Sequence, residues 1–258
     1  MKIKLNRDGG IRTHGPFVPN EVRYQAALHP AVVNFMTHFT LTSSVPWISL
    51  PLTVGSGQQQ MQTDLDLLTA HQRGEFRGAL RFYLWQPAAI SLGYHQQDWP
   101  EHWRQCHYQG QALEVVRRPS GGAAVLHQGD LCYALVTGMA PGGCRQQYQR
   151  LQDWLIHGWQ ALGVHLHQGQ ATPSRGQVSC FATATPADLV TETGQKFIGS
   201  AQLRRGRSVL YQGSMQLHPD PDLWVQVFGS VAPPPVRLPS LEAVVAHLGA
   251  TVRDYFAV

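Results

Sequence analysis

The sequence predicts an α+β fold in which helices flank a mixed, mostly antiparallel sheet. Strand-like segments pair locally through turns, as at Thr193 and Gly194, and helices of ordinary length lie between them. The chain has 258 residues, of which 43% are hydrophobic and 14% charged. It can therefore bury one sizeable core with at most a small appendage.

The first 46 residues differ from the rest of the chain. Residues 8–16 show neither a helical nor a strand period, and no hydrophobic core begins before Trp47. The segment resembles a transfer-RNA gene read as protein, and it lacks the arginine-rich amphipathic helix of a targeting sequence. We predict that residues 1–46 are disordered or a mis-assigned extension, with the true start downstream, for example at Met36. Residues 47–258 are expected to form a single domain.

From Trp47 onward, the hydrophobic pattern predicts alternating strands and helices. Strands are expected at residues 48–50, 81–84, 89–93, 112–117, 131–136, 164–166, 188–190, 196–198, 208–211 and 214–217. Helices are expected around 61–68, between 98 and 109, from about 145 to 162, and after Ser240, which can cap the last one. In the first helix, Asp64 and Asp66 are expected to lie off the apolar stripe.

The charge and the cysteines exclude several classes of protein. A net charge of +4 with scattered basic residues does not indicate nucleic-acid binding, although an acidic protein partner would fit. Cys106, Cys132, Cys144 and Cys180 form no Cys-x-x-Cys pair, so we expect reduced thiols and no metal. No apolar run approaches the ~20 residues of a membrane span, and no secretory signal is visible. A cytoplasmic protein is expected.

A small-residue loop follows two arginines in the stretch Arg117-Arg118-Pro119-Ser120-Gly121-Gly122, which continues to His127. Glycines there let backbone N–H groups approach a carbonyl or phosphate oxygen of a ligand. The arginines could add charge-assisted contacts to an anion. The alternative is a hairpin turn with a solvated arginine pair.

A second stretch reads Gly194-Gln195-Lys196-Phe197-Ile198-Gly199-Ser200-Ala201-Gln202 and is followed by Gly213-Ser214. Together, the two stretches resemble the biotin/lipoate A/B protein ligase family in order, spacing and residue type. The resemblance covers roughly residues 47–215. It implies a class II synthetase-like catalytic domain with a sheet and flanking helices.

The resemblance also implies a set of site residues. Lys196 would face the ligand, with its ammonium near an oxygen where negative charge develops. His127 would line the acyl site and assist proton transfer. The residues expected to bind substrate are Arg118, Ser120, Gly121, Gly122, His127, Gly199, Ser200 and Ala201. Arg118 is alternatively expected to meet an acidic carrier protein on the surface.

The residue type at position 180 distinguishes two branches of this family. The cysteine-dependent octanoyltransferase branch has a cysteine before a phenylalanine at this place, and the chain has Cys180-Phe181. The ATP-dependent lipoate ligases usually have an asparagine-aspartate pair here. A nearby Lys196 ammonium would activate the thiol as a nucleophile. The alternative is a small buried cysteine, which is the default for an isolated one.

The expected activity is octanoyl transfer from octanoyl–acyl carrier protein to a lysine of a lipoyl-domain acceptor. The glycine-cleavage H protein and dehydrogenase E2 subunits are such acceptors. Neither a metal nor ATP is expected, because the thioester is already activated. Ala123 and Gln128 depart from the Gly-Gly-Gly and His-Asp of the ligases. An ATP- and Mg²⁺-dependent lipoate–protein ligase remains the first alternative, and a non-catalytic cofactor-binding protein on the same fold is the second.

Overall fold

The computed structural model describes residues 45–139, 143–171, 184–234 and 236–256. The expected N-terminal extension lies almost entirely outside these residues. Cys180 lies outside them as well.

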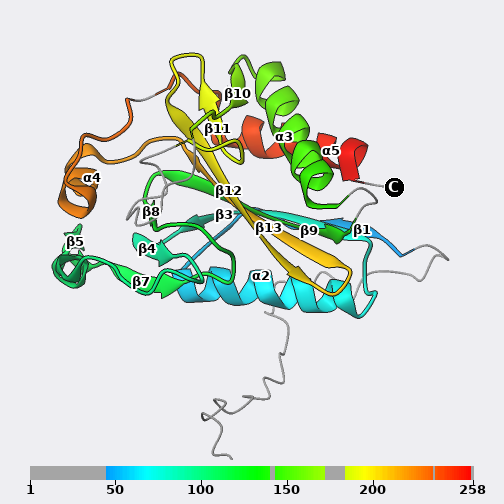
Figure 1. Ribbon diagram of the computed structural model, residues 1–258, viewed down its shortest axis with the longest axis horizontal. Helices are drawn as coiled ribbons and strands as arrows, with labels where there is room; N and C mark the ends of the chain where they lie inside the picture. The colour runs from blue at the N-terminus through cyan, green and yellow to red at the C-terminus, as the bar shows by residue number, and fades with distance from the viewer. Residues whose placement is uncertain (1–44, 140–142, 172–183, 235, 257–258) are drawn as a thin grey trace, which may run out of the picture.

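The central sheet has eight strands and is mixed but mostly antiparallel, as the sequence predicts (Figure 1). β1 and β2 run parallel to β3, and the remaining neighbours pair antiparallel. The order is β1 (Trp47–Ser49), β3 (Gly78–Trp85), β9 (Asp130–Gly138), β13 (Ser208–Gln216), β12 (Lys196–Arg205), β11 (Leu189–Thr191) and β10 (Leu166–Gln168), with β2 (Thr53–Gly55) also beside β3.

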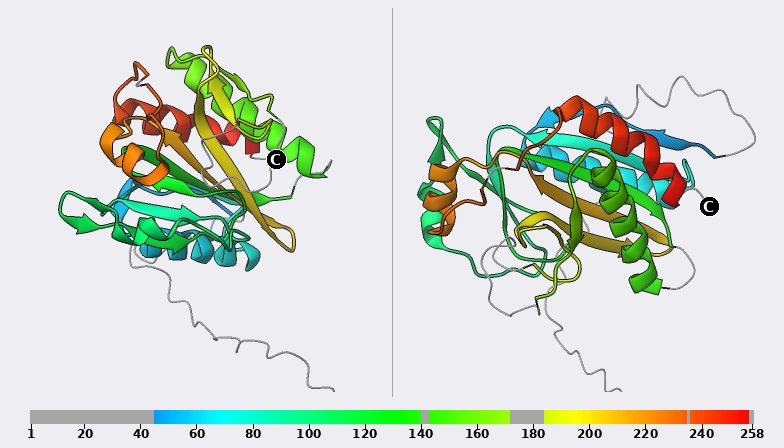
Figure 2. Two further views of the ribbon diagram at one scale, coloured as in Figure 1. Left: turned by 60° about the vertical axis from the view of Figure 1, so that its left-hand side comes forward. Right: turned by 90° about the horizontal axis from the view of Figure 1, so that it is seen from above.

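Helices cover both faces of this sheet (Figures 1 and 2). α2 (Gly57–Gln72) packs on one face against β3, β9 and β13. α3 (Gly143–Ala161) and α5 (Leu241–Phe256) pack together on the other face, over a core that includes Trp154 and Trp159. A shorter helix, α4 (Pro221–Phe228), lies toward the small sheet. In the described part of the chain, no helix has the length and apolar character needed to cross a bilayer.

A small second sheet carries the glycine-rich loop. It contains β4 (Ala89–Leu92) between β7 (Glu114–Arg117) and β8 (Val125–His127). A separate hairpin is formed by β5 (His107–Tyr108) and β6 (Gln111–Ala112). Because β7 and β8 both pair with β4, the loop that joins them returns over the end of β4. This closure brings the loop against β13, in the middle of the central sheet.

Some of the expected elements differ from the structure. The helix expected between residues 98 and 109 is a single 3-10 turn, η1 (Glu101–Gln105), because Trp103 is fully buried and donates its indole N–H to Val227 O at 2.7 Å. The strands expected at 208–211 and 214–217 are one strand, β13. Gly213 does not break it; a Cβ there would lie 2.1 Å from the ring of Tyr133, so the glycine makes room for that ring.

The expectation that Asp64 and Asp66 lie off the buried face of the first helix is wrong. Asp64 is completely buried, and Asp66 is 4% exposed. Asp64 points toward β3, where Arg81 is also buried and approaches its carboxylate at 2.9 Å. A buried charge is tolerated when it is paired and hydrogen-bonded, and periodicity of apolar residues cannot detect such a pair.

Candidate functional site

A small cavity of about 60 Å³ lies where the glycine-rich loop meets the middle of the central sheet. Its lining comes from the small sheet and its loop, from α2, and from β3, β9, β12 and β13 of the central sheet. Seven of the residues expected from the sequence line it: Arg118, Gly121, Gly122, His127, Gly199, Ser200 and Ala201. The two sequence stretches, about 80 residues apart, therefore form one site.

Arg118 is part of the loop's internal structure. Its side chain is 7% exposed, and its guanidinium donates to Ser91 O at 3.0 Å and to the carbonyl oxygens of Gly121 and Ala123 at 2.7 Å each. These contacts fold the loop around the guanidinium. The alternative in which Arg118 meets a carrier protein on the surface does not fit this burial.

Gly122 is required by the same arrangement. Its φ of +97° lies in the region that favours glycine, and a Cβ would stand 2.8 Å from the Arg118 guanidinium. The bare Cα is therefore needed by the loop itself, whether or not a ligand is bound.

Ser120 lies behind the cavity lining. It is 1% exposed, and its hydroxyl donates to Gln212 Oε1 at 2.7 Å. Gln212 lines the cavity and donates through Nε2 to Asp64 Oδ2 at 2.7 Å. Ser120 therefore fixes the orientation of the Gln212 amide, and no pattern in the sequence predicts this partner.

Asp64 and Arg81 form a buried pair beneath these residues. Arg81 also donates to the side chain of Gln60, and Tyr83 donates to Asp64 Oδ2 at 3.0 Å. Burial raises the pKa of Asp64 above its usual value, although the charge of Arg81 and the hydrogen bonds from Gln212 and Tyr83 oppose this shift. The network links α2 to β3, β13 and the glycine-rich loop.

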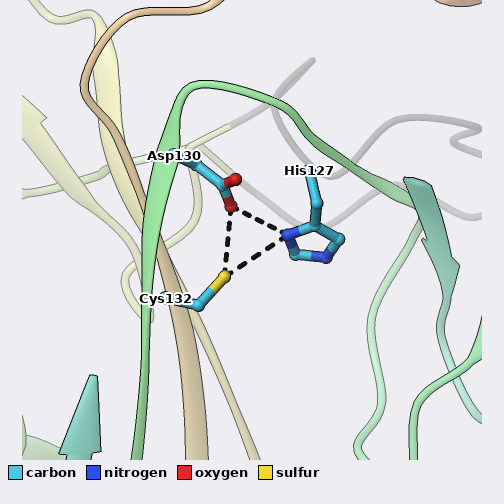
Figure 3. A group of neighbouring side chains, drawn as sticks. All are labelled: His127, Asp130 and Cys132. Atoms are coloured by element: carbon cyan, nitrogen blue, oxygen red, sulfur yellow. Dashed lines mark hydrogen bonds and ion pairs between the residues drawn. The ribbon is translucent and has the colours of Figure 1, made fainter. Parts of the chain in front are cut away.

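His127 belongs to a second buried cluster, with Asp130 and Cys132 (Figure 3). His127 Nδ1 lies 2.8 Å from Asp130 Oδ2, and Cys132 Sγ lies 3.1 Å from the same oxygen and 3.3 Å from Nδ1. The three ligand atoms lie within 4.8 Å of one another, as in a three-ligand metal site. Here, however, the hydrogen bonds within the cluster already occupy them.

The second ring nitrogen of His127 and one face of its imidazole ring also have partners. His127 Nε2 lies 2.8 Å from Ser91 Oγ, and the ring stacks on Trp85 with centroids 3.9 Å apart. Both ring nitrogens therefore have protein partners. In this structure, the ring forms a wall of the cavity, and its predicted part in proton transfer stays a prediction.

Cys132 lines the cavity but is poorly suited to nucleophilic attack. Burial, followed by the neighbouring Asp130 carboxylate, raises the pKa of its thiol well above the usual value. Asp130 shows the opposite behaviour. Its burial opposes ionisation, but the charge of His127 and hydrogen bonds from His127, Ser214 and Cys132 outweigh burial and lower its pKa.

Lys196 begins β12 and does not line this cavity. It is 6% exposed, and its Nζ lies 2.9 Å from Asp188 Oδ2. It borders a neighbouring groove between the β11–β12 hairpin and α4, together with Gly194, Trp224 and Phe228. Cys180 lies outside the described residues, so its predicted closeness to Lys196 stays a prediction.

With this geometry established, comparison with known proteins identifies the family. The family model described as the lipoyl protein ligase A/B catalytic domain matches residues 56–244. The chain belongs to this family. The match spans α2, α4 and all strands of both sheets except β1 and β2, and therefore includes both networks around the cavity.

Relatives in the family include proteins named octanoyltransferase LipM. The one from Kyrpidia tusciae is 33% identical over 194 residues, which cover 68% of each chain. The one from Symbiobacterium thermophilum is 36% identical over 173 residues, 64% of this chain and 62% of that one.

Solved structures show the same fold. A T. acidophilum protein with bound lipoic acid superimposes with a TM-score of 0.64 at 19% identity, covering 82% of this chain and 86% of that chain. A lipoate-protein ligase A bound with ATP gives a TM-score of 0.61 at 19% identity, covering 82% and 85%. At this identity, the likeness concerns the fold alone.

The small number of lysines in the sequence is a further feature that points to Lys196. The chain has seventeen arginines but only three lysines, at positions 2, 4 and 196. Lys196 is therefore the single ε-amine between residue 5 and the last residue. The sequence does not predict Asp188 as the partner of Lys196, because only the hairpin places the two side chains together.

Proposed function

We propose that this protein is an octanoyltransferase of lipoate biosynthesis. It takes the octanoyl group from octanoyl–acyl carrier protein and passes it to a lysine of a lipoyl domain, such as that of the glycine-cleavage H protein or a dehydrogenase E2 subunit. The observation that carries this proposal is the similarity to several LipM octanoyltransferases, at 30–36% identity over about two thirds of the chain.

The cavity suits an acyl chain. Met61, Tyr83, Trp85 and Val125 give much of its lining an apolar character. An octanoyl chain is apolar except at its carbonyl, and burying it in such a lining is favourable. The loop glycines leave backbone amides accessible at one side of the cavity, where the carbonyl oxygen can be bound.

The reaction proceeds in two transfers. The Cys180 thiolate attacks the thioester carbonyl, the carrier thiol leaves, and an octanoyl-cysteine forms. The loop amides stabilise the negative charge that develops on the carbonyl oxygen. Lys196, which borders the neighbouring groove, stays the predicted partner of Cys180. The ε-amine of the acceptor lysine then attacks the new thioester, forming the amide and releasing Cys180. Neither ATP nor a metal takes part, because the acyl group arrives as a thioester.

Replacing Cys180 tests this mechanism. We expect Cys180→Ala to abolish octanoyl transfer from the carrier protein to a lipoyl domain while the fold remains intact, because replacing one small side chain with another usually costs little stability. The measurement is octanoylation of the acceptor by mass spectrometry, with circular dichroism of the variant as the control for folding.

The same assay with free octanoate, with and without ATP and Mg²⁺, distinguishes the ligase alternative. Transfer that occurs only with ATP, or a Cys180→Ala variant with near-normal turnover, would contradict the covalent mechanism and favour an ATP-dependent lipoate–protein ligase.

A further inference from the structure

Arginines from two segments far apart in the sequence gather at one end of the central sheet. Residues 71–78 join α2 to β3, and residues 203–208 span the turn between β12 and β13. The two segments are in contact, because His71 Nδ1 lies 2.7 Å from Ser208 Oγ (Figure 1). Their arginines, called the arginine patch below, are Arg73, Arg77, Arg204, Arg205 and Arg207.

The arginine patch holds the excess positive charge of the chain. The two segments contain five arginines and one acidic residue, Glu75, so their net charge is +4. The whole chain also has a net charge of +4, which means that the charges of all other residues balance. Glu75 pairs with Arg73 at 3.8 Å, and every arginine of the patch except Arg204 is exposed. Most of this charge is therefore available to a partner.

Arg204 supplies guanidinium nitrogens that have no partner in the described part of the chain. The residue is half-buried, and its Nε and Nη2 are buried without a hydrogen bond. Buried donors that stay unpaired cost free energy. A carboxylate can accept two neighbouring guanidinium N–H groups at once, which makes it the group that best fits this position.

β12 connects the arginine patch to the cavity. Gly199, Ser200 and Ala201 line the cavity, and Arg204 follows three residues later in the same strand, roughly 10 Å further along. The strand is half-buried from Ser200 to Arg204, so this part of it is accessible from outside. A partner bound to the patch therefore lies near the cavity but not directly over it.

We propose that the arginine patch is the docking surface for the acidic carrier protein that delivers the octanoyl group. This inference rests on the proposed function, which requires such a donor. Arg118 cannot provide the surface, because it is buried. A carrier protein holds its acyl thioester at the end of a long, flexible arm, which can extend from the patch to the cavity. The acceptor lysine has only a four-carbon stem, so the lipoyl domain must bind closer to the cavity.

The patch fits an acidic protein better than a nucleic acid. Single-stranded nucleic acids stack their bases on accessible aromatic side chains. Apart from His71, the two segments contain one aromatic residue, Phe76, and it is buried. A duplex requires a basic face or stripe, whereas the charge here is confined to one end of the sheet. Carboxylates on a protein surface match isolated guanidinium groups and speed association through complementary charge.

The test reverses two charges at the tip of the hairpin, in the double variant Arg205→Glu, Arg207→Glu. The specificity constant kcat/KM is measured with octanoyl–carrier protein and with octanoyl-pantetheine, an uncharged thioester without the carrier. With the carrier, we expect a fall of about tenfold or more at about 0.01 M salt and a smaller fall at about 0.15 M, because salt screens exposed charges. With octanoyl-pantetheine, kcat/KM should not change. Arg77→Glu, in the other segment, should show a smaller loss of the same kind.

A matched control makes the same change of charge elsewhere on the surface. Arg104 and Arg237 are exposed and lie outside the patch, so the double variant Arg104→Glu, Arg237→Glu should resemble wild type with both donors. Equal losses in the two double variants overturn the proposal, as do equal losses with the two donors in the patch variant. A loss confined to the KM of the lipoyl domain also overturns it and assigns the patch to the acceptor.

A binding measurement separates this inference from the proposed function. Fluorescently labelled carrier protein is titrated with wild type and with the patch variant, and its anisotropy reports binding whether or not transfer occurs. A wild type that transfers octanoyl from neither donor contradicts the proposed function, but weaker carrier binding by the patch variant still supports the docking surface. Equal binding by the two proteins overturns the docking surface. A wild type that binds a labelled DNA duplex through the patch, and not the carrier, overturns it as well.

Discussion

Two carboxylates, Asp64 and Asp130, are fully buried next to residues that line the cavity, yet their pKa values shift in opposite directions. The pKa of Asp64 is raised and that of Asp130 is lowered. Each has a cationic or potentially cationic neighbour: Arg81 at 2.9 Å for Asp64, and His127 at 2.8 Å for Asp130. The difference therefore does not follow from burial alone or from the presence of a partner.

The two carboxylates differ in how their hydrogen bonds are divided between the two oxygens. Around Asp130, three donors converge on the same oxygen, Oδ2: His127 Nδ1, Ser214 Oγ at 2.7 Å and the Cys132 thiol. Around Asp64, Arg81 approaches one oxygen, while Gln212 and Tyr83 approach the other. For Asp64, the free-energy cost of burying the charged form exceeds the stabilisation that its partners provide. The protonation state of a buried carboxylate therefore depends on all of its partners and not on a single ion pair.

Breaking the Asp64–Arg81 pair should have the largest effect on stability. Arg81→Met leaves the buried Asp64 carboxylate without its counter-charge, and we expect a loss of about 3–5 kcal/mol in the free energy of unfolding. Denaturant titration measures it. The double variant Asp64→Asn, Arg81→Met should recover part of the loss, because no unpaired charge remains. A double variant no more stable than Arg81→Met would contradict this account.

The pH dependence of stability should distinguish the two carboxylates next. The pKa of Asp130 is lowered from 3.8, so Asp130 contributes stability that is present above this pH and is lost as the pH falls through the folded pKa. The pKa of Asp64 is raised from 3.8, so its contribution is greatest at low pH and is lost as the pH rises through its folded pKa.

Variants of both residues, Asp130→Asn and Asp64→Asn, test this contrast. The difference in unfolding free energy between wild type and Asp130→Asn, about 1–3 kcal/mol at neutral pH, should shrink as the pH falls below about 3.8. The difference between wild type and Asp64→Asn should instead shrink as the pH rises. Parallel pH profiles for the two variants would show that the carboxylates behave alike.

The smallest effect is expected at Cys132, which belongs to the Asp130 cluster. Cys132→Ala should cost about 1 kcal/mol of stability and leave octanoyl transfer nearly unchanged, because the raised pKa of this thiol makes it a poor nucleophile. Acceptor octanoylation and thermal unfolding measure the two effects. A loss of transfer as complete as that expected for Cys180→Ala would assign the nucleophile to Cys132.

Local patterns in the sequence predicted much of the fold. The mixed sheet, α2, α3, α5 and the hairpin at Lys196 follow from periodicity and turn residues. α4 was missed, although Asp220 caps it and Pro221 opens it, because eight residues give too short a period. The two motif stretches also predicted seven of the residues that line the cavity, since their order and spacing are properties of the chain itself, but Ser120 and Lys196 lie outside that lining.

Tertiary structure alone decided how those residues are used. Ser120 and Gln212 are 92 residues apart and Asp64 and Gln212 are 148 residues apart, yet each pair is hydrogen-bonded. From the sequence, Arg118 is simply a charged residue. In the fold, its guanidinium is buried and is hydrogen-bonded to carbonyl oxygens of the glycine-rich loop. The sequence by itself determined which chemical groups the site has. Which of them touch depends on sheet register and packing, because contacts over such separations are set by the whole core and not by neighbours along the chain.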